Sequence, residues 1–349
     1  MVMRLFAPQF LVVWAFIASA VAVHFRGKVR LGFWRQVSDH STIMAPYNVL
    51  MYMFSAVPNR PILQVGMVPE LTTLRDNWQE IREEALHLFA QGQIKAADKY
   101  NDWGFNSFFR TGWKRFYLKW YDAPLPSALA NCPKTVELLN KIPNVKGAMF
   151  ANLPPGGRLV QHRDPYAGSL RYHLGLVTPK SPGECRIFID GEPYSWRDGE
   201  DLLFDETYLH YAENTTSDER IILFCDIVRP LKTQTMTAVN RWVSKHIINE
   251  SATQNEEGER VGWINRIFGY IYYVRLAGNE GLEQAGLLHG EIPPDRRHPG
   301  RVPRNCVRLS SQGLGGRRRA CAAPKSFPDF VLKGRARRAC RRARIRATR

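Results

Sequence analysis

Three side chains that can ligate a metal stand close together in one stretch of the sequence. His162 and Asp164 are separated by a single residue, and His210 follows further along the chain. On a β-strand, residues i and i+2 point to the same side, so the first histidine and the carboxylate can reach one point in space. Two histidines and one carboxylate, holding one face of a metal, form the ligand set of non-haem Fe(II) oxygenases. The sequence therefore predicts an iron site at His162, Asp164 and His210.

A fourth residue extends this group. Arg220 opens the apolar run 221–224, downstream of His210. A buried arginine can hold a carboxylate through two parallel hydrogen bonds, as a site for 2-oxoglutarate requires. A His-x-Asp pair by itself occurs by chance in many proteins. The later histidine and arginine favour a functional site, because three separate requirements are met in order.

The residues that carry this chemistry lie in a strand-rich part of the chain. Short strands with Gly or Pro between them are predicted at 148–153, 158–162, 170–177, 185–190, 194–196, 201–204 and 220–227. Asp190-Gly191 is a strong hairpin signal between two of them. Many short strands at such spacing are typical of a sandwich or a jelly roll.

Two patterns precede the strands. Apolar residues at helical spacing predict a core-packing helix through Leu71, Leu74, Trp78, Ile81, Ala85 and Leu88. Residues 103–121 then combine many aromatic side chains with interleaved Arg and Lys. Such a segment can stack RNA bases, face a membrane interface or a substrate channel, or simply pack in a core. The near-neutral charge and the apolar N-terminus, both described below, favour a membrane interface, a substrate channel or core packing over RNA binding.

Longer motifs around the four residues resemble a known family. The run His162 to Leu176 (HRDPYAGSLRYHLGL), and the run 204–207 followed by His210 and Arg220, are similar to the aspartyl/asparaginyl β-hydroxylase signature. Within that family the sequence most resembles the bacterial branch that hydroxylates lipid A. The resemblance covers about residues 23–276.

The resemblance implies a fold and an activity. The expected fold is mainly β, a double-stranded β-helix (jelly-roll or cupin-like) barrel with flanking helices. The expected activity is that of a dioxygenase using Fe(II), 2-oxoglutarate and O2, which hydroxylates C2 of a lipid A secondary acyl chain and releases succinate and CO2. In the family an Arg-x-His pair contacts 2-oxoglutarate, which implies the same role for Arg171 and His173 beside Arg220. His162, Asp164 and His210 are the expected metal ligands, with no catalytic residue beyond the metal centre.

Two other classes of function remain as alternatives. One is an aspartyl/asparaginyl hydroxylase acting on a peptide or protein, as in the animal branch of the family. The other is a membrane-anchored protein whose barrel no longer holds metal. The apolar N-terminus argues against the first alternative, and the intact ligand set argues against the second.

The N-terminus predicts a membrane anchor. Residues 5–23 are mostly apolar and just reach the length needed to cross a bilayer. Basic residues follow at Arg26, Lys28, Arg30 and Arg35. The positive-inside rule then predicts a single-pass anchor in the bacterial inner membrane, with the catalytic part in the cytoplasm. A cleaved signal peptide ending near Ala18-Ser19-Ala20 is the alternative.

The strong positive charge does not indicate a nucleic-acid partner. The chain has a net charge of +17, and residues 289–349 contain eighteen basic and three acidic side chains. The rest of the chain is nearly neutral, so binding to lipid A is expected without nucleic acid, and no protein partner is inferred. The basic end cannot bury enough apolar surface to fold. It is either a tail for anionic lipid or, as we favour, the product of a shifted reading frame.

These patterns divide the chain into five parts. They are a membrane anchor (1–25), a helical N-terminal part of the catalytic unit (26–145), the oxygenase core (146–232), C-terminal amphipathic helices (233–278) and a basic tail expected to be disordered (279–349). The cysteines outside the tail, Cys132, Cys185 and Cys225, are widely spaced and form no C-x-x-C pair. They are expected to be ordinary buried thiols in a reducing compartment.

Overall fold

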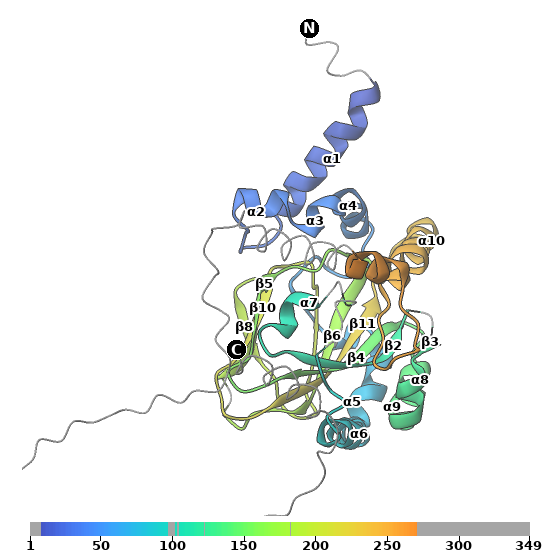
Figure 1. The fold of residues 1–349 in the computed structure, drawn as a ribbon. Helices are drawn as coiled ribbons and strands as arrows, with labels where there is room; N and C mark the ends of the chain where they lie inside the picture. The colour runs from blue at the N-terminus through green and yellow to red at the C-terminus, as the bar shows by residue number, and fades with distance from the viewer. Residues whose placement is uncertain (1–7, 97–101, 103–104, 122, 182, 271–349) are drawn as a thin grey trace, which may run out of the picture. The chain divides into compact units, whose positions relative to one another are not determined.

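Two antiparallel β-sheets form the centre of the protein (Figure 1). The computed structural model describes residues 8–96, 102, 105–121, 123–181 and 183–270. The larger sheet has the order β1-β9-β6-β11-β4-β2-β3, and the smaller has the order β5-β10-β7-β8. The predicted mainly-β class is confirmed. The larger sheet contains β1 (Ile62–Leu63), β2 (Lys114–Trp120), β3 (Ala123–Pro124), β4 (Val145–Leu153), β6 (Ser169–Val177), β9 (Asp201–Phe204) and β11 (Arg220–Val228), and the smaller contains β5 (Arg158–His162), β7 (Cys185–Ile189), β8 (Glu192–Ser195) and β10 (His210–Asn214).

The central strands of the larger sheet are buried on both faces. Along β6, Tyr172 and Leu174 point to one side and join the hydrophobic core. Arg171 and His173 alternate with them, so they point to the other face and line a cavity together with Ile187 of the smaller sheet. Two alternate residues of β6, Arg171 and His173, therefore reach the cavity between the sheets.

The hairpin between β7 and β8 forms where the sequence predicts it. Asp190 and Gly191 both have positive φ, at 52° and 87°, and Ile189 pairs directly with Glu192. Two residues with positive φ give the turn whose twist matches that of the strands. The Asp190 carboxylate also accepts hydrogen bonds from the backbone N–H groups of Lys28 and Val29. This turn therefore holds the N-terminal segment as well.

Helices cover the sheets and follow the predicted apolar stripe. Leu71, Leu74, Ile81, Ala85 and Leu88 are all buried, as predicted. The stripe is not one helix, because the chain leaves helical geometry at Asn77, where α5 ends and α6 begins. The helices are α1 (Pro8–His24), α2 (Phe33–Val37), α3 (His40–Ile43), α4 (Ala45–Met53), α5 (Thr72–Asp76), α6 (Trp78–Ala90), α7 (Asn106–Phe109), α8 (Pro126–Asn131), α9 (Pro133–Asn140) and α10 (Gln234–Val243), with 3-10 turns at Val65–Met67, Pro69–Leu71 and Asn249–Ser251 and a π turn at Ser244–Ile248.

The prediction of a single-pass membrane anchor is wrong. Helix α1 has 17 residues, and among the described residues no helix is both long and apolar enough to span a bilayer. At about 1.5 Å per residue, such a helix is shorter than the roughly 30 Å hydrocarbon layer. After α1 the chain turns at Gly27, with φ 88°, and Arg26 packs against Asp205. The inner-membrane placement that depended on the anchor is corrected with it.

The aromatic segment 103–121 contributes to the core and to the cavity. Phe116 and Tyr117 on β2 are buried in the main core. Phe105 and Phe108, in and beside α7, line the cavity instead. Cys132, Cys185 and Cys225 are free and buried, as expected for ordinary thiols. The predicted basic tail, 279–349, lies outside the described residues.

Candidate metal and co-substrate site

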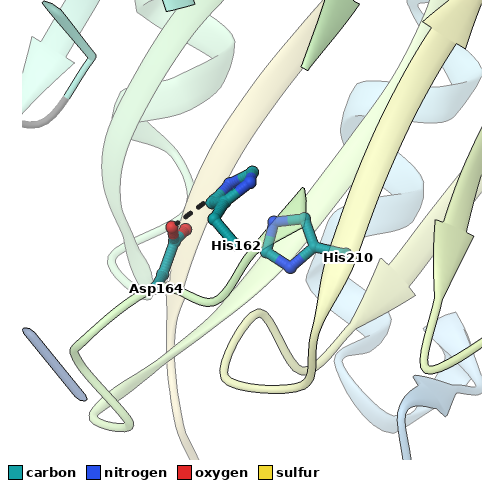
Figure 2. A group of neighbouring side chains, drawn as sticks. All are labelled: His162, Asp164 and His210. Carbon is teal, nitrogen blue, oxygen red and sulfur yellow. Dashed lines mark ion pairs between the residues drawn. The ribbon is translucent and has the colours of Figure 1, made fainter. Parts of the chain in front are cut away.

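The smaller sheet brings the two predicted histidine ligands together. His162 ends β5, His210 begins β10, and the two residues are direct partners in the antiparallel pair. Asp164 lies two residues beyond the end of β5, in a loop, and its side chain turns toward the histidines (Figure 2). Ligand atoms of the three residues lie within 4.8 Å of one another. The three residues that the sequence predicted as ligands can therefore hold one metal ion.

Both histidines present a free ring nitrogen to this point. The Nδ1 atom of His162 lies 2.7 Å from the Val160 carbonyl oxygen, and that of His210 lies 2.9 Å from the Tyr208 carbonyl oxygen. A backbone carbonyl fixes the proton on Nδ1, which leaves the Nε2 lone pair for a metal. Burial lowers the pKa of His210 to about 3 and also lowers the pKa of His162. Both rings are thus neutral at pH 7, as metal ligation requires.

The carboxylate of Asp164 is ionised. Burial by itself raises its pKa, but the positive charge of Arg171 outweighs burial, and the net pKa is below the ordinary value. One carboxylate oxygen lies 3.7 Å from Nε2 of His162, and the other accepts a hydrogen bond of 2.7 Å from Nη2 of Arg171. Asp164 therefore offers a charged oxygen on the side of the histidines.

Arg220 lies in the same cavity with its charge unmatched. Its side chain is buried, and it makes no hydrogen bond or ion pair with any other described residue. The guanidinium lies 4.4 Å from the centre of the Trp196 ring, which attracts a cation but does not neutralise it. Burial lowers the pKa of Arg220 to about 10, so it remains protonated at pH 7. A buried, unpaired guanidinium is costly unless a ligand supplies the anion.

His173 supplies a second unsatisfied group to the cavity. Its Nδ1 accepts a 3.4 Å hydrogen bond from the Trp196 indole N–H, so the ring proton lies on Nε2. The Nε2 atom is buried and has no partner within the described part of the chain. Burial holds the pKa of His173 well below its usual value. Like the Arg220 guanidinium, the Nε2–H group of this neutral ring is a buried donor without an acceptor among the described residues.

Arg171, the third predicted co-substrate residue, has protein partners. Its guanidinium binds the carboxylates of Asp164, Glu206 and Asp226 and stacks on the Phe224 ring. Glu206 belongs to the 204–207 motif, but neither it nor Asp226 was predicted as a site residue. Asp226 reaches Arg171 through the pairing of β6 with β11, and Glu206 through the pairing of β6 with β9, and the local sequence signals neither pairing. A direct contact between Arg171 and the co-substrate stays a prediction.

The remaining walls of the cavity are apolar and aromatic. The Phe108 ring lies 4.7 Å from the His162 ring, so α7 covers one side of the candidate metal position. The cavity therefore combines candidate metal ligands, an unpaired guanidinium and apolar walls. The apolar and aromatic lining consists of Phe105, Phe108, Trp113, Ala151, Leu159, Ile187, Trp196, Phe204, Ala212, Ile222 and Phe224.

Comparison with known proteins assigns a family to this arrangement. Residues 75–230, which include all six predicted site residues, match the family model described as aspartyl/asparaginyl beta-hydroxylase. The chain is 31% identical over 192 residues to an ornithine lipid ester-linked acyl 2-hydroxylase of Rhizobium tropici, a match covering 55% of this chain and 68% of that protein. It is 29% identical over 174 residues to human aspartyl/asparaginyl beta-hydroxylase, a match covering 48% of this chain and 22% of that protein.

Among solved structures, a Pseudomonas putida prolyl-4-hydroxylase is similar over 44% of this chain and 87% of its own. The identity is 19% and the TM-score is 0.29. A score this low carries no argument about function. The family relationship therefore rests on sequence.

Proposed function

Because the chain belongs to the aspartyl/asparaginyl β-hydroxylase family, we propose that it is an Fe(II)/2-oxoglutarate-dependent dioxygenase acting on a lipid acyl chain. The proposed reaction consumes 2-oxoglutarate and O2, converts a C2–H bond to C2–OH, and releases succinate and CO2. The specific substrate that we propose is a secondary acyl chain of lipid A. The observation that carries the proposal is the unpaired Arg220 guanidinium, buried in one cavity with the His162, Asp164 and His210 side chains.

The donor set fits Fe(II). His162, Asp164 and His210 offer two neutral nitrogens and one charged oxygen, and they occupy one side of the candidate metal position. With only three protein ligands, positions remain for a bidentate co-substrate and for O2. Bound iron would supply the oxidising power needed to hydroxylate an unactivated C–H bond. The protein supplies binding, orientation and exclusion of water.

The unsatisfied donors fit 2-oxoglutarate. Arg220 is proposed to bind the carboxylate remote from the metal through paired, charge-assisted hydrogen bonds. The Nε2–H group of His173 is proposed to donate to a co-substrate oxygen, and Arg171 keeps its predicted role as a further contact. The Arg220 guanidinium and the His173 ring both line this cavity, and both contact Trp196. One dianionic ligand would satisfy them together.

The apolar lining supports an acyl chain as the group that is hydroxylated. The walls near His162 are aromatic or aliphatic, and apolar walls favour an apolar group over a charged peptide side chain. The Rhizobium relative is named for acting on an acyl chain at its 2-position. The two facing antiparallel sheets also support the proposal of a double-stranded β-helix core.

The direct test incubates the purified full chain with Fe(II), 2-oxoglutarate, O2 and one candidate substrate at a time. The candidates are lipid A, an ornithine lipid and an Asp/Asn-containing peptide, and mass spectrometry detects the gain of one oxygen atom. We expect hydroxylated lipid A and an equal amount of succinate. His162→Ala and His210→Ala should lose both products, and Asp164→Ala should also be inactive, while the fold is kept.

The other outcomes separate the alternatives. If only ornithine lipid gains oxygen, the substrate is ornithine lipid and not lipid A. If only the peptide gains oxygen, the protein is a peptide hydroxylase. No product and no metal binding would leave a non-catalytic barrel. Mass spectrometry of lipid A from cells with and without this gene tests the same proposal in the organism.

A further inference from the structure

The carboxylate of Asp164 is held by a hydrogen bond on the side away from His162. Asp164 is not part of a strand, so no ladder of backbone hydrogen bonds fixes its position. Its backbone N–H donates to the Glu206 carbonyl oxygen at 3.0 Å. Its carboxylate receives the 2.7 Å hydrogen bond from Nη2 of Arg171 on the side away from His162. The direction of the carboxylate therefore depends on where Arg171 lies.

Arg171 itself has little freedom to move. Its side chain is 8% exposed, and its guanidinium carbon lies 3.7 Å from the centre of the Phe224 ring. Its Nε atom lies 3.1 Å from a carboxylate oxygen of Asp226, and its Nη2 atom also donates to Glu206. A planar guanidinium that lies on an aromatic ring, with two carboxylates hydrogen-bonded to Nη2 and a third close to Nε, is restricted in orientation.

The two outer carboxylates are themselves fixed. Glu206 accepts a 2.6 Å hydrogen bond from the Ser169 hydroxyl, and Asp226 accepts one of 3.3 Å from the Tyr121 hydroxyl. Asp226 also packs directly over Gly147, where an added Cβ atom would lie 2.8 Å from its carboxylate oxygen. Strands β4, β6 and β11 thus form a rigid base for the guanidinium.

We propose that Arg171 is a positioning residue that orients Asp164 toward the metal, with Glu206 and Asp226 holding Arg171 in place. The inference rests on the proposed function, because it takes Asp164 as a metal ligand. It adds a role to the predicted contact of Arg171 with the co-substrate, and it assigns a role to Glu206 and Asp226. Groups that orient a metal ligand in this way commonly change metal affinity when they are altered.

The test is a double-mutant cycle on metal affinity. Co2+ is titrated, without 2-oxoglutarate, into the full chain and into Arg171→Lys, Asp164→Ala and the double variant. Lysine keeps the positive charge but loses the planar fork, so the field at the metal is nearly unchanged and only orientation is lost. We expect Arg171→Lys to weaken Co2+ binding about 10- to 100-fold in the native background. In the Asp164→Ala background the same change should have almost no effect.

Arg229→Lys is the matched control. Arg229 is also buried and ion-paired, but it contacts Asp205 and not a candidate metal ligand. It should lower the melting temperature and leave Co2+ affinity unchanged. If Arg171→Lys does not fold, Glu206→Gln takes its place in the same cycle.

The outcomes are distinguishable. Equal losses of affinity in both backgrounds, or no loss in either, would overturn the positioning role while leaving the metal site in place. Failure of the unaltered chain to bind Co2+ would overturn the metal site and the proposed function together. A loss confined to the background that retains Asp164 supports the inference.

Discussion

Two buried arginines at opposite ends of one strand have very different surroundings. Arg220 begins β11, and Arg229 follows directly after the strand ends at Val228. Arg229 donates to the carbonyl oxygens of Ala167 and Ser169 and forms a 2.8 Å ion pair with Asp205. Arg220 makes no such bond with any residue that the structure describes. Arginines at the two ends of this strand therefore differ in ion pairing: Arg229 pairs with Asp205, and Arg220 has no ion-pair partner among the described residues.

The difference separates a structural site from a ligand site. Asp205 also binds Arg26 at 2.7 Å and accepts hydrogen bonds from the N–H and hydroxyl groups of Thr207, so both oxygens of this carboxylate are paired within the protein. The Arg220 guanidinium instead lies over the Trp196 ring, which does not neutralise its charge. An unpaired buried charge lowers the stability of the unliganded protein, so its presence points to an anion that the protein binds. Matched substitutions can test this contrast.

The largest effect is expected from Arg229→Met. This change leaves Asp205 with one buried ion-pair partner instead of two and removes two hydrogen bonds to carbonyl groups. We expect the free energy of unfolding to fall by about 3 kcal/mol. Urea unfolding measures the change, and co-substrate affinity of the folded fraction should stay the same. A variant as stable as the unaltered protein would contradict the structural role of this cluster.

The pH dependence of stability should reveal the same cluster. Burial raises the pKa of Asp205, but Arg229 and Arg26 outweigh burial and hold the net pKa well below its usual range. In the unfolded chain the carboxyl takes up a proton near pH 4, while the folded protein keeps it ionised. The unfolded state then binds more protons, so this stabilisation is full above about pH 4 and is lost as the pH falls further.

Asp205→Asn measures that contribution. The stability gap between the unaltered protein and the variant should be constant from pH 7 to about pH 5 and should narrow below about pH 4. Urea unfolding at each pH gives the gap. A gap that stays constant down to pH 3 would mean that Asp205 is not ionised and paired as described.

Arg220→Met should affect stability and co-substrate affinity in the opposite way to Arg229→Met. Removing an unpaired buried charge is neutral or stabilising, so the melting temperature should stay the same or rise. Affinity for 2-oxoglutarate should fall by about 2 kcal/mol, because paired charge-assisted hydrogen bonds are lost. Calorimetric titration of 2-oxoglutarate into the Co2+-loaded protein measures the loss. An equal rise in the lipid requirement would count against a specific role in co-substrate binding.

The smallest effect is expected from His173→Phe. The substitution keeps the aromatic packing against Phe204 and Phe224 and removes the orphaned Nε2–H donor. We expect affinity for 2-oxoglutarate to fall by about 1 kcal/mol, the value of one hydrogen bond, and stability to fall slightly, because the buried Trp196 N–H loses its acceptor. The same titration measures it. Loss of stability without loss of affinity would make His173 a packing residue.

Much of the local structure followed from the sequence. The predicted strands 158–162 and 201–204 coincide with β5 and β9, and the Asp190-Gly191 turn has the expected geometry. Alternation of side chains and turn residues are local signals, so short segments carry them completely. The helix predicted through Leu71 and Leu88 is interrupted at Asn77. Strand β10 was not predicted, because its sequence shows only weak alternation of apolar and polar residues.

The sequence alone determined which side chains are present for chemistry: two histidines, one carboxylate and one arginine, in an order that one family shares. Only the tertiary structure decided how they are used. The pairing of β5 with β10 places His162 opposite His210, and the pairing of β6 with β11 and β9 brings Asp226 and Glu206 to Arg171. Contact with Asp205 likewise fixes Arg26, just after the end of α1. These contacts join residues far apart in the chain, and no short stretch of sequence contains the information that specifies them.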